Sequence, residues 1–201
     1  METKEMTLQE IQDKLGYKVK IVDEKPKKKL VDIEVGKTFK VGNLEFIVLE
    51  HLEDDETAII LKDFWKTDRF DKSTNDYEQS SIRKELNSEF FEQLGAIVGK
   101  ENILLHRVDL TSDDGRVDYG CCHDVISLLT CDMYRKYVYI LDKYKHVDWW
   151  WLATAYSTKS NGCELPVRCV GKLGTLYYRN YFNDYGVRPF CILKSNIFVS
   201  E

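Results

Sequence analysis

Three consecutive tryptophans, Trp149, Trp150 and Trp151, constrain the fold of this chain more than any other feature. They begin a run with strand character that continues through Ala153 and Thr154. Successive side chains of a strand point to opposite faces of its sheet, so the three indoles cannot share one face. Each indole has a large apolar surface and an N–H group that needs an acceptor. A core on both faces of the sheet is favoured, and a binding platform on one face is the alternative.

The composition is that of an ordinary globular protein. The 201 residues are 43% hydrophobic, 12% aromatic and 31% charged, which excludes a disordered or low-complexity chain. A length of this order suits one domain, or one domain with a small appendage. The net charge of −5 disfavours a protein that coats the phosphates of a nucleic acid, so nucleic acid is not expected as the sole partner.

The sequence shows neither a membrane-spanning segment nor a secretion signal. No apolar run approaches the ~20 residues that a membrane helix needs. The N-terminus is polar and no apolar segment follows it, so a signal peptide is not expected. We therefore expect a cytoplasmic protein without a membrane partner, in which the six cysteines are reduced and mostly buried.

The first part of the chain is expected to form a small helix–strand element. Thr7 and Glu10 make a capping box for a helix over 7–15, and Gly16 is a fitting end for it. Residues 17–21 alternate in polarity with period two, which predicts a strand.

A linker is predicted after this strand. Residues 23–29 contain a proline and three successive lysines, which is typical of a solvated connection. The predicted division is therefore 1–29 for the helix–strand element and linker, and 30–201 for the main domain.

The main domain is predicted to be α+β, with short strands, two main helices and long loops. Apolar residues recur every three or four positions in 80–99 and in 131–144, which predicts the two helices. The buried face of the second helix is expected to carry Met133, Tyr137, Ile140 and Tyr144. Alternating or apolar runs between turn residues predict strands at 38–41, 44–50, 57–62, 103–110, 125–129, 149–155, 167–170, 175–178, 187–193 and 197–199. Residues 66–79 are predicted to be a surface loop, and 115–123 to be irregular.

Residue types that bind metals occur close together without the spacing of a known site. Cys121, Cys122, His123 and Cys131 offer the ligand types of zinc, but adjacent cysteines cannot easily both bind one ion. Core or loop cysteines are therefore favoured. The aspartates at 113, 114 and 118 lack the pattern of a calcium loop. Without a nucleophile elbow, a phosphate-binding loop or a dinucleotide-binding glycine motif, we expect no catalytic residue, metal or cofactor.

Tyrosine and arginine are concentrated in the last third of the chain. These two residue types are enriched at binding hot spots, because they combine a large contact area with polar groups. The residues predicted to bind a partner are Trp149, Trp151, Tyr156, Arg168, Tyr177, Tyr178, Arg179, Tyr181 and Tyr185, with about half of the tyrosines exposed. Arg188, between Val187 and Pro189 in an apolar run, is predicted to be buried and structural.

An ordered set of motifs over 36–199 resembles an uncharacterised bacterial and phage domain family. The motifs are Ser80-Ser81-Ile82-Arg83, the run VISLLT at 125–130, WWWLATAYS at 149–157, Gly171 with Gly174, and GVRP at 186–189. The tryptophan strand and the GVRP ending are also similar to C-type-lectin-like domains of the formylglycine-generating and phage variable-receptor type. The resemblance implies a C-type-lectin-like domain, in which the arginine of GVRP holds the last strand to an irregular loop region.

The sequence departs from this family at two points. Ala153 stands where the family has an arginine after its tryptophans, so a polar contact expected there is absent. The copper-binding cysteine pair of formylglycine-generating enzymes has no counterpart, since the residues around Cys169 differ, and this disfavours an enzyme of that kind.

The leading hypothesis is a non-enzymatic protein-binding module encoded by a phage or mobile element. Its partner would be a host or phage protein, such as a host defence protein that it inhibits. The alternative is an enzyme or small-ligand-binding domain of the formylglycine-generating class that uses the same loops, with a metal at Cys121, Cys122 or His123.

Overall fold

The computed structural model describes residues 6–16, 18, 28–146 and 148–200. Helix α1 (Leu8–Leu15) begins at the predicted capping box, where the Thr7 side chain accepts a hydrogen bond from the Glu10 N–H group. The helix ends at Gly16 with a φ of 73°, and none of its side chains is buried. The predicted strand at 17–21 falls almost entirely outside the described residues.

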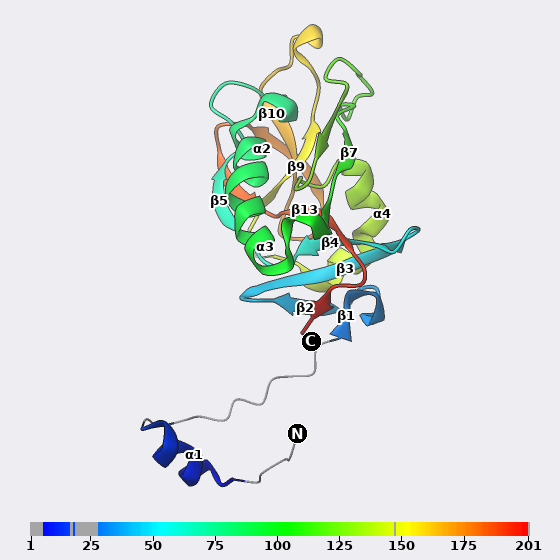
Figure 1. Cartoon of the computed structure of the whole chain (residues 1–201). Coiled ribbons are helices and arrows are strands. Elements are labelled where there is room, and N and C mark those ends of the chain that lie inside the picture. Colours follow the sequence, from blue (N-terminus) through cyan, green and yellow to red (C-terminus); the bar gives the residue numbers. More distant parts are fainter. Residues whose placement is uncertain (1–5, 17, 19–27, 147, 201) are drawn as a thin grey trace.

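Two five-stranded sheets form the main domain (Figure 1). The tryptophan sheet has the order β11-β10-β9-β12-β5, with bounds β5 Lys66–Arg69, β9 Trp150–Ala155, β10 Pro166–Val170, β11 Leu176–Asn180 and β12 Asp184–Val187. The meander sheet has the order β2-β3-β4-β13-β6, with bounds β2 Thr38–Val41, β3 Leu44–Leu52, β4 Glu56–Leu61, β6 Ile103–Leu104 and β13 Phe190–Lys194. Two strand pairs complete the domain: β1 (Lys28–Lys29) with β14 (Phe198–Val199), and β7 (His106–Asp109) with β8 (Cys121–Asp124).

These elements confirm the predicted α+β class and the three-stranded meander. The linker prediction is wrong for Lys28 and Lys29, because they form β1 and pair with Val199 and Phe198 near the other end of the chain. Within the described ranges, no helix has both the length and the apolar character needed to cross a membrane.

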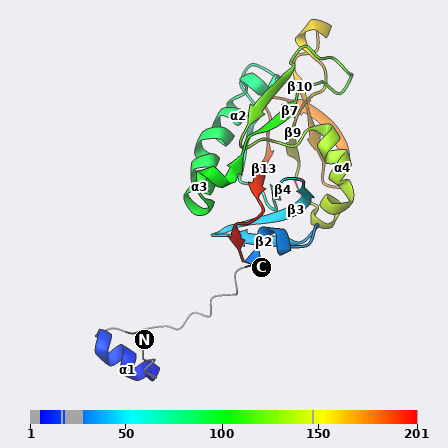
Figure 2. The same cartoon turned by 45° about the vertical axis from the view of Figure 1, so that its right-hand side comes forward.

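Two helical segments pack on opposite sides of the strands (Figure 2). The first comprises α2 (Ser81–Glu85), a π turn (Leu86–Phe90) and α3 (Phe91–Val98), which together confirm the helix predicted over 80–99. The second is α4 (Cys131–Leu141), which begins as predicted at Thr130, whose hydroxyl accepts from the Met133 N–H group. The buried face of α4 differs from the prediction: it consists of Cys131, Tyr134, Tyr137 and Leu141.

Strand β9 separates two hydrophobic cores. Trp151 is fully buried in the core that also contains the apolar residues of α2 and α3, and its ring meets Phe70 edge-on at 5.8 Å. Trp150 is buried in the second core, 5.7 Å from the ring of Tyr134 on α4. The Trp151 indole N–H donates to the Asp68 carbonyl at 3.0 Å. The two-sided core favoured by the sequence is therefore confirmed for these two tryptophans, and Ala153 is buried beside Trp151 in the first core.

Two segments that are predicted to lack regular structure contain strands. The stretch 66–79 is not simply a surface loop: it contains β5 and the fully buried Asn75. The Asn75 amide donates to the carbonyls of Ser157 at 2.9 Å and Pro166 at 3.2 Å, which compensates for burying it. The predicted irregular stretch 115–123 ends in β8, which begins at Cys121.

The predicted strand at 125–129 is buried but is not a regular strand. The Asn87 side chain takes the place of a neighbouring strand: it accepts from the N–H groups of Val125 and Ile126 and donates to the Ile126 carbonyl at 2.8 Å. The predicted strand at 187–193 is divided at Arg188 and Pro189, so that β12 joins the tryptophan sheet and β13 joins the meander sheet.

A buried ion pair explains the serine–arginine motif. Ser80 caps α2, which places Arg83 on its first turn. The Arg83 guanidinium donates to both carboxylate oxygens of Asp124, at 2.8 and 3.0 Å from Nε, and its Nη1 donates to the Glu78 carbonyl. The Asp124 side chain is only 1% exposed, so this pair fixes α2 against the end of β8.

Arg188 is buried, as the sequence predicts, and it bridges three segments. Its Nε donates to the Leu61 carbonyl at 2.7 Å, and its guanidinium lies 5.1 Å from the Trp150 ring centre. Its Nη2 has no hydrogen-bond partner among the described residues. Burial lowers the pKa of Arg188 to about 9, so the side chain remains charged at neutral pH.

Replacing Arg188 with alanine is expected to lower the free energy of unfolding by on the order of 3 kcal/mol, because it empties the space beside Trp150 and leaves the Leu61 carbonyl unpaired. Arg188→Met, which keeps the volume and removes the buried charge, should cost clearly less. Urea denaturation followed by fluorescence measures both. An alanine variant that is as stable as the wild type would contradict the structural role.

Asp124→Asn is expected to cost about 3–5 kcal/mol, since it leaves the Arg83 charge partly buried without its partner. The matched control is Glu92→Gln, which removes the carboxylate from the exposed Lys100–Glu92 ion pair and should cost about 0–1 kcal/mol. Both are measured by urea denaturation. Equal losses in the two variants would show that the Asp124 pair does not hold α2 in place.

Candidate binding surface

Aromatic side chains and one arginine stack on one face of the tryptophan sheet. The Trp149 ring lies 4.6 Å from Tyr177 and 6.0 Å from Tyr185, and Tyr185 meets the edge of Trp151 at 4.9 Å. The Arg179 guanidinium lies over the Trp149 ring at 4.0 Å. A guanidinium this close to an indole face is held by a cation–π interaction. Arg179 forms no ion pair with a carboxylate among the described residues.

The β10–β11 hairpin places Tyr177 and Arg179 on this face. In its register Tyr177 pairs with Cys169 and Arg179 with Val167. The turn between the strands is closed by a hydrogen bond from the Gly174 N–H to the Gly171 carbonyl. A Cβ atom on Gly171 would lie 2.8 Å from the Tyr177 ring, so glycine is needed for this ring to lie where it does. The glycine pair of the motif therefore positions an aromatic side chain.

The opposite face of the same strands carries a second group of predicted binding residues. Tyr178 lies 4.6 Å from Tyr156, and the Arg168 guanidinium lies 5.3 Å from the Tyr156 ring centre. Arg168 forms an ion pair with Asp113, which in turn pairs with Arg135 of α4 at 2.9 Å. The residues predicted as one surface therefore lie on two faces of one sheet.

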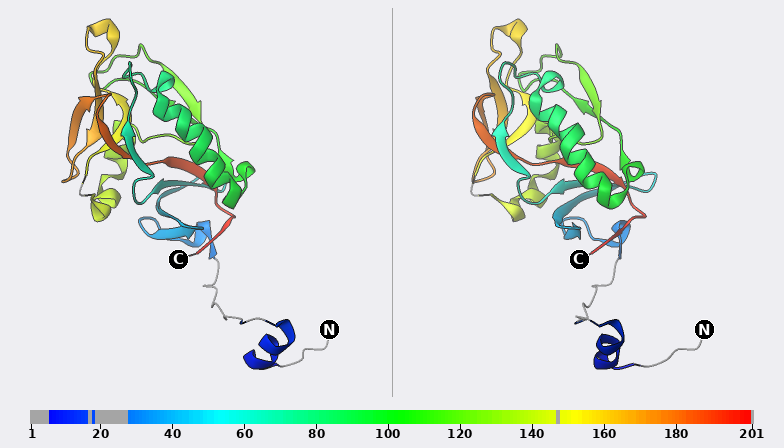
Figure 3. Two further views of the ribbon diagram at one scale, coloured as in Figure 1. Left: turned by 90° about the vertical axis from the view of Figure 1, so that its left-hand side faces the viewer. Right: turned by 60° about the vertical axis from the view of Figure 1, so that its left-hand side comes forward.

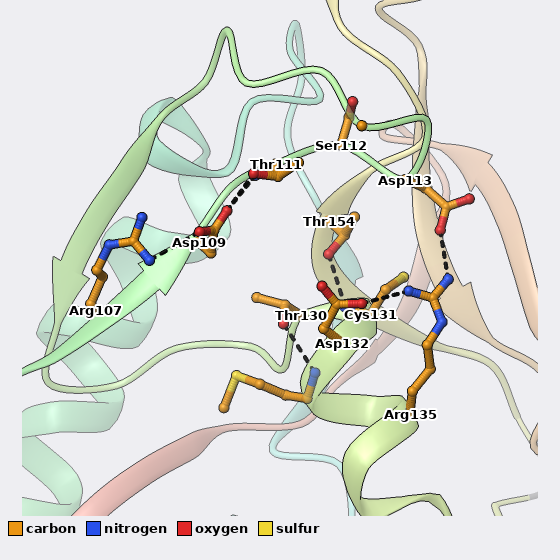
Figure 4. Close-up of a pocket in the computed structure, with 12 residues that line it drawn as sticks. Arg107, Asp109, Thr111, Ser112, Asp113, Thr130, Cys131, Asp132, Arg135 and Thr154 are labelled. Carbon is orange, nitrogen blue, oxygen red and sulfur yellow. Dashed lines mark hydrogen bonds and ion pairs between the residues drawn. The ribbon is translucent and has the colours of Figure 1, made fainter.

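A polar pocket of about 460 Å³ adjoins this second face (Figure 4). The Asp113 and Arg135 side chains point toward each other at one side of the pocket, and Asp132 also pairs with Arg135. The Cys131 N–H at the start of α4 donates to the Thr154 hydroxyl at 2.9 Å. Burial raises the pKa of the Cys131 thiol to about 11, so it stays protonated at neutral pH and is a poor nucleophile. The charges of this pocket are largely neutralised by one another.

Exposed apolar side chains gather on β11 and the segments that flank it. We call them the aromatic patch: Tyr156, Leu165, Leu173, Tyr177, Tyr178 and Phe182, which are 37–78% exposed. Tyr177 and Tyr178 project from opposite faces of β11, which is the last strand on its side of the sheet. Figure 3 shows β11, in orange, at the outer edge of the sheet, away from α2 and α3.

The structure corrects part of the predicted site. Trp151 is fully buried, so its prediction as a binding residue is wrong and it belongs to the core. Five other predicted residues are half-buried and pack beneath the exposed ones: Trp149, Arg168, Arg179, Tyr181 and Tyr185. The sequence did not indicate Asp113 and Arg135 as residues of this site. They are distant from Arg168 in the sequence, and only the fold brings the three side chains together as ion pairs.

The residue types that suggested metal sites do not converge. Consecutive residues of β8 alternate between its faces, so Cys122 points into the first core while Cys121 and His123 point away from it. In the ranges that the structure describes, no three histidine, cysteine, aspartate or glutamate side chains lie close enough to hold a metal ion. The carboxylates of Asp114 and Asp118 accept hydrogen bonds from Ser157 and Thr158, and they hold two loops together.

Comparison of the chain with protein-family models, with curated proteins and with solved structures finds no match.

Proposed function

We propose that this chain is a non-enzymatic protein-binding module that holds its partner at the aromatic patch. The observation that carries the proposal is the gathering of six exposed apolar side chains around one edge strand. Monomeric proteins seldom expose such patches without a use, and tyrosine and arginine are the residue types that dominate binding hot spots. Arg179, fixed over Trp149, adds a positioned cation to the patch.

The charges near the patch favour a protein over a nucleic acid. Arg168 is neutralised by Asp113, which leaves Arg179 as the cation on β11. A nucleic-acid surface needs several cations to contact successive phosphates, and the whole chain has a net charge of −5. An apolar patch with one arginine matches the centre of a protein interface better.

The pocket and the cysteines offer little support to the enzymatic alternative. The acidic and basic groups of the pocket pair with one another, and Cys131 is protonated. Cys169, the cysteine nearest to the motif of formylglycine-generating enzymes, is buried, and burial raises its pKa to about 12. A thiol in that environment does not ionise at neutral pH.

The finer points of the proposal depend on the motif resemblance. A C-type-lectin-like fold is consistent with the buried Arg188, which ties the segment between β12 and β13 to β4. The phage or mobile-element origin, the cytoplasmic location and the inhibition of a host defence protein are proposed from the resemblance and the sequence pattern alone.

Tyr178→Ala and Arg179→Ala are each expected to weaken partner binding by about 1–3 kcal/mol with little change in melting temperature. Tyr178 is 51% exposed, whereas Tyr181 packs against the core and is a poorer choice for the test. The control is Tyr139→Ala on α4, which removes a tyrosine that is 84% exposed and lies outside the patch.

Proteins retained from a host lysate by the wild type and the three variants identify the partner, and titration calorimetry with the purified partner measures each affinity. The proposal predicts that Tyr139→Ala binds like the wild type. A partner bound equally by all four proteins would show that the interface lies elsewhere.

A further inference from the structure

The free edge of β11 presents unpaired main-chain groups. The Gly171 N–H donates to the Thr175 carbonyl, and the Tyr181 N–H donates to the Leu165 carbonyl. In an antiparallel pair, hydrogen-bonded positions alternate with positions whose main-chain groups point outward. These two bonds therefore direct the N–H groups of Tyr177 and Arg179 toward β10 and those of Leu176 and Tyr178 toward solvent. Neither outward N–H meets an acceptor within the part of the chain that the structure describes.

The other three edges of the two large sheets are covered, charged or very short. The main chain of Lys40 on β2 exchanges hydrogen bonds with Ser200, which follows β14. On β5, Lys66 forms ion pairs with Asp68 and Glu85. β6 has only two residues. Natural proteins protect sheet edges in these ways against pairing with other chains.

β11 has none of these protections except one arginine. It contains neither proline nor lysine, and its central side chains are exposed tyrosines. The Arg179 Nη1 donates to the outward carbonyl of Tyr178 at 2.8 Å. The cation therefore occupies one acceptor of the open edge, and it has no carboxylate partner among the described residues.

We propose that β11 accepts an extended, acidic segment of the partner protein as an additional strand. This inference rests on the proposed protein-binding function and specifies how the partner is held. The partner strand takes hydrogen bonds from the outward N–H groups of Leu176 and Tyr178 and donates one to the Tyr178 carbonyl. Main-chain pairing gives such complexes affinity, and side-chain pockets on alternating positions give them specificity.

The same geometry assigns a role to each neighbouring side chain. When a partner N–H binds the Tyr178 carbonyl, the Arg179 guanidinium is displaced from it while remaining over Trp149. The guanidinium then pairs with a carboxylate of the incoming strand. Because of this ion pair, β11 prefers an acidic segment. The next residue of the partner strand lies on the other face, against Tyr178 and Tyr156.

The experiment selects binders from displayed peptides of about twelve randomised residues and maps them on the unmodified protein by main-chain hydrogen exchange. We expect the selected peptides to be rich in aspartate and glutamate. We also expect them to slow exchange at the Leu176 and Tyr178 amides by about ten-fold or more. Arg179→Gln should remove the acidic preference.

A matched pair of variants isolates the main-chain bond. Tyr178→Ala and Tyr178→Pro both remove the ring, but only proline also removes the outward N–H, which an edge strand tolerates. Melting temperatures establish that both variants fold. We expect the proline variant to bind the selected peptides about ten-fold more weakly than the alanine variant.

The possible outcomes separate this inference from the proposed function. Peptides that need the Tyr178 ring, yet bind the two variants equally and leave both amides unprotected, would overturn strand addition and keep the aromatic patch as a binding surface. Failure to select any peptide sensitive to Tyr178 would contradict both proposals. Self-association of the protein that Tyr178→Pro abolishes would replace the partner with a second copy. Arg179-dependent binding of an oligothymidine would replace it with a nucleic acid.

Discussion

The burial of β9 on both faces is the constraint on which the rest of this structure depends. Trp150 and Trp151 point in opposite directions from adjacent positions, and each is at most 3% exposed. One side must therefore be covered by the core that contains α2 and α3, and the other by the core that contains α4. The meander sheet contributes side chains to both cores. The buried Arg188 also packs on Trp150 where the chain passes from one sheet to the other, so the tryptophan strand fixes that crossing as well.

The binding surface lies where the tryptophan sheet extends beyond the elements that bury β9. β10 continues the sheet beyond β9, and β11 is the last strand on that side. Tyr177 and Tyr178 therefore reach solvent from both faces of one strand. Behind Tyr177, the half-buried rings of Trp149 and Tyr185 pack against the first core. A rigid interior strand thus supports an exposed aromatic edge, which keeps the entropy cost of holding a partner low.

Local patterns in the sequence predicted the elements whose stability is local. The helix over 80–99, the Thr130 cap and the meander follow from periodicity and turn residues, and the structure confirms them. Asn75 and Asn87 were missed because their buried amides bind carbonyls that are distant in the sequence, such as those of Ser157 and Ile126. The sequence indicated only part of the binding site, again because contacts between distant residues decide the rest. Composition indicated the tyrosines, but the sheet register decides which face each one occupies.

Hydrogen exchange of the free protein, resolved by residue in β11, tests this account most directly. The register predicts that the Tyr177 and Arg179 amides, which face β10, exchange slowly. It also predicts that the Leu176 and Tyr178 amides, which face the open edge, exchange faster by about a hundred-fold or more. Slow exchange at all four amides would mean that the edge is already covered. Fast exchange at all four would mean that β11 is not a stable strand, and either result would contradict the account.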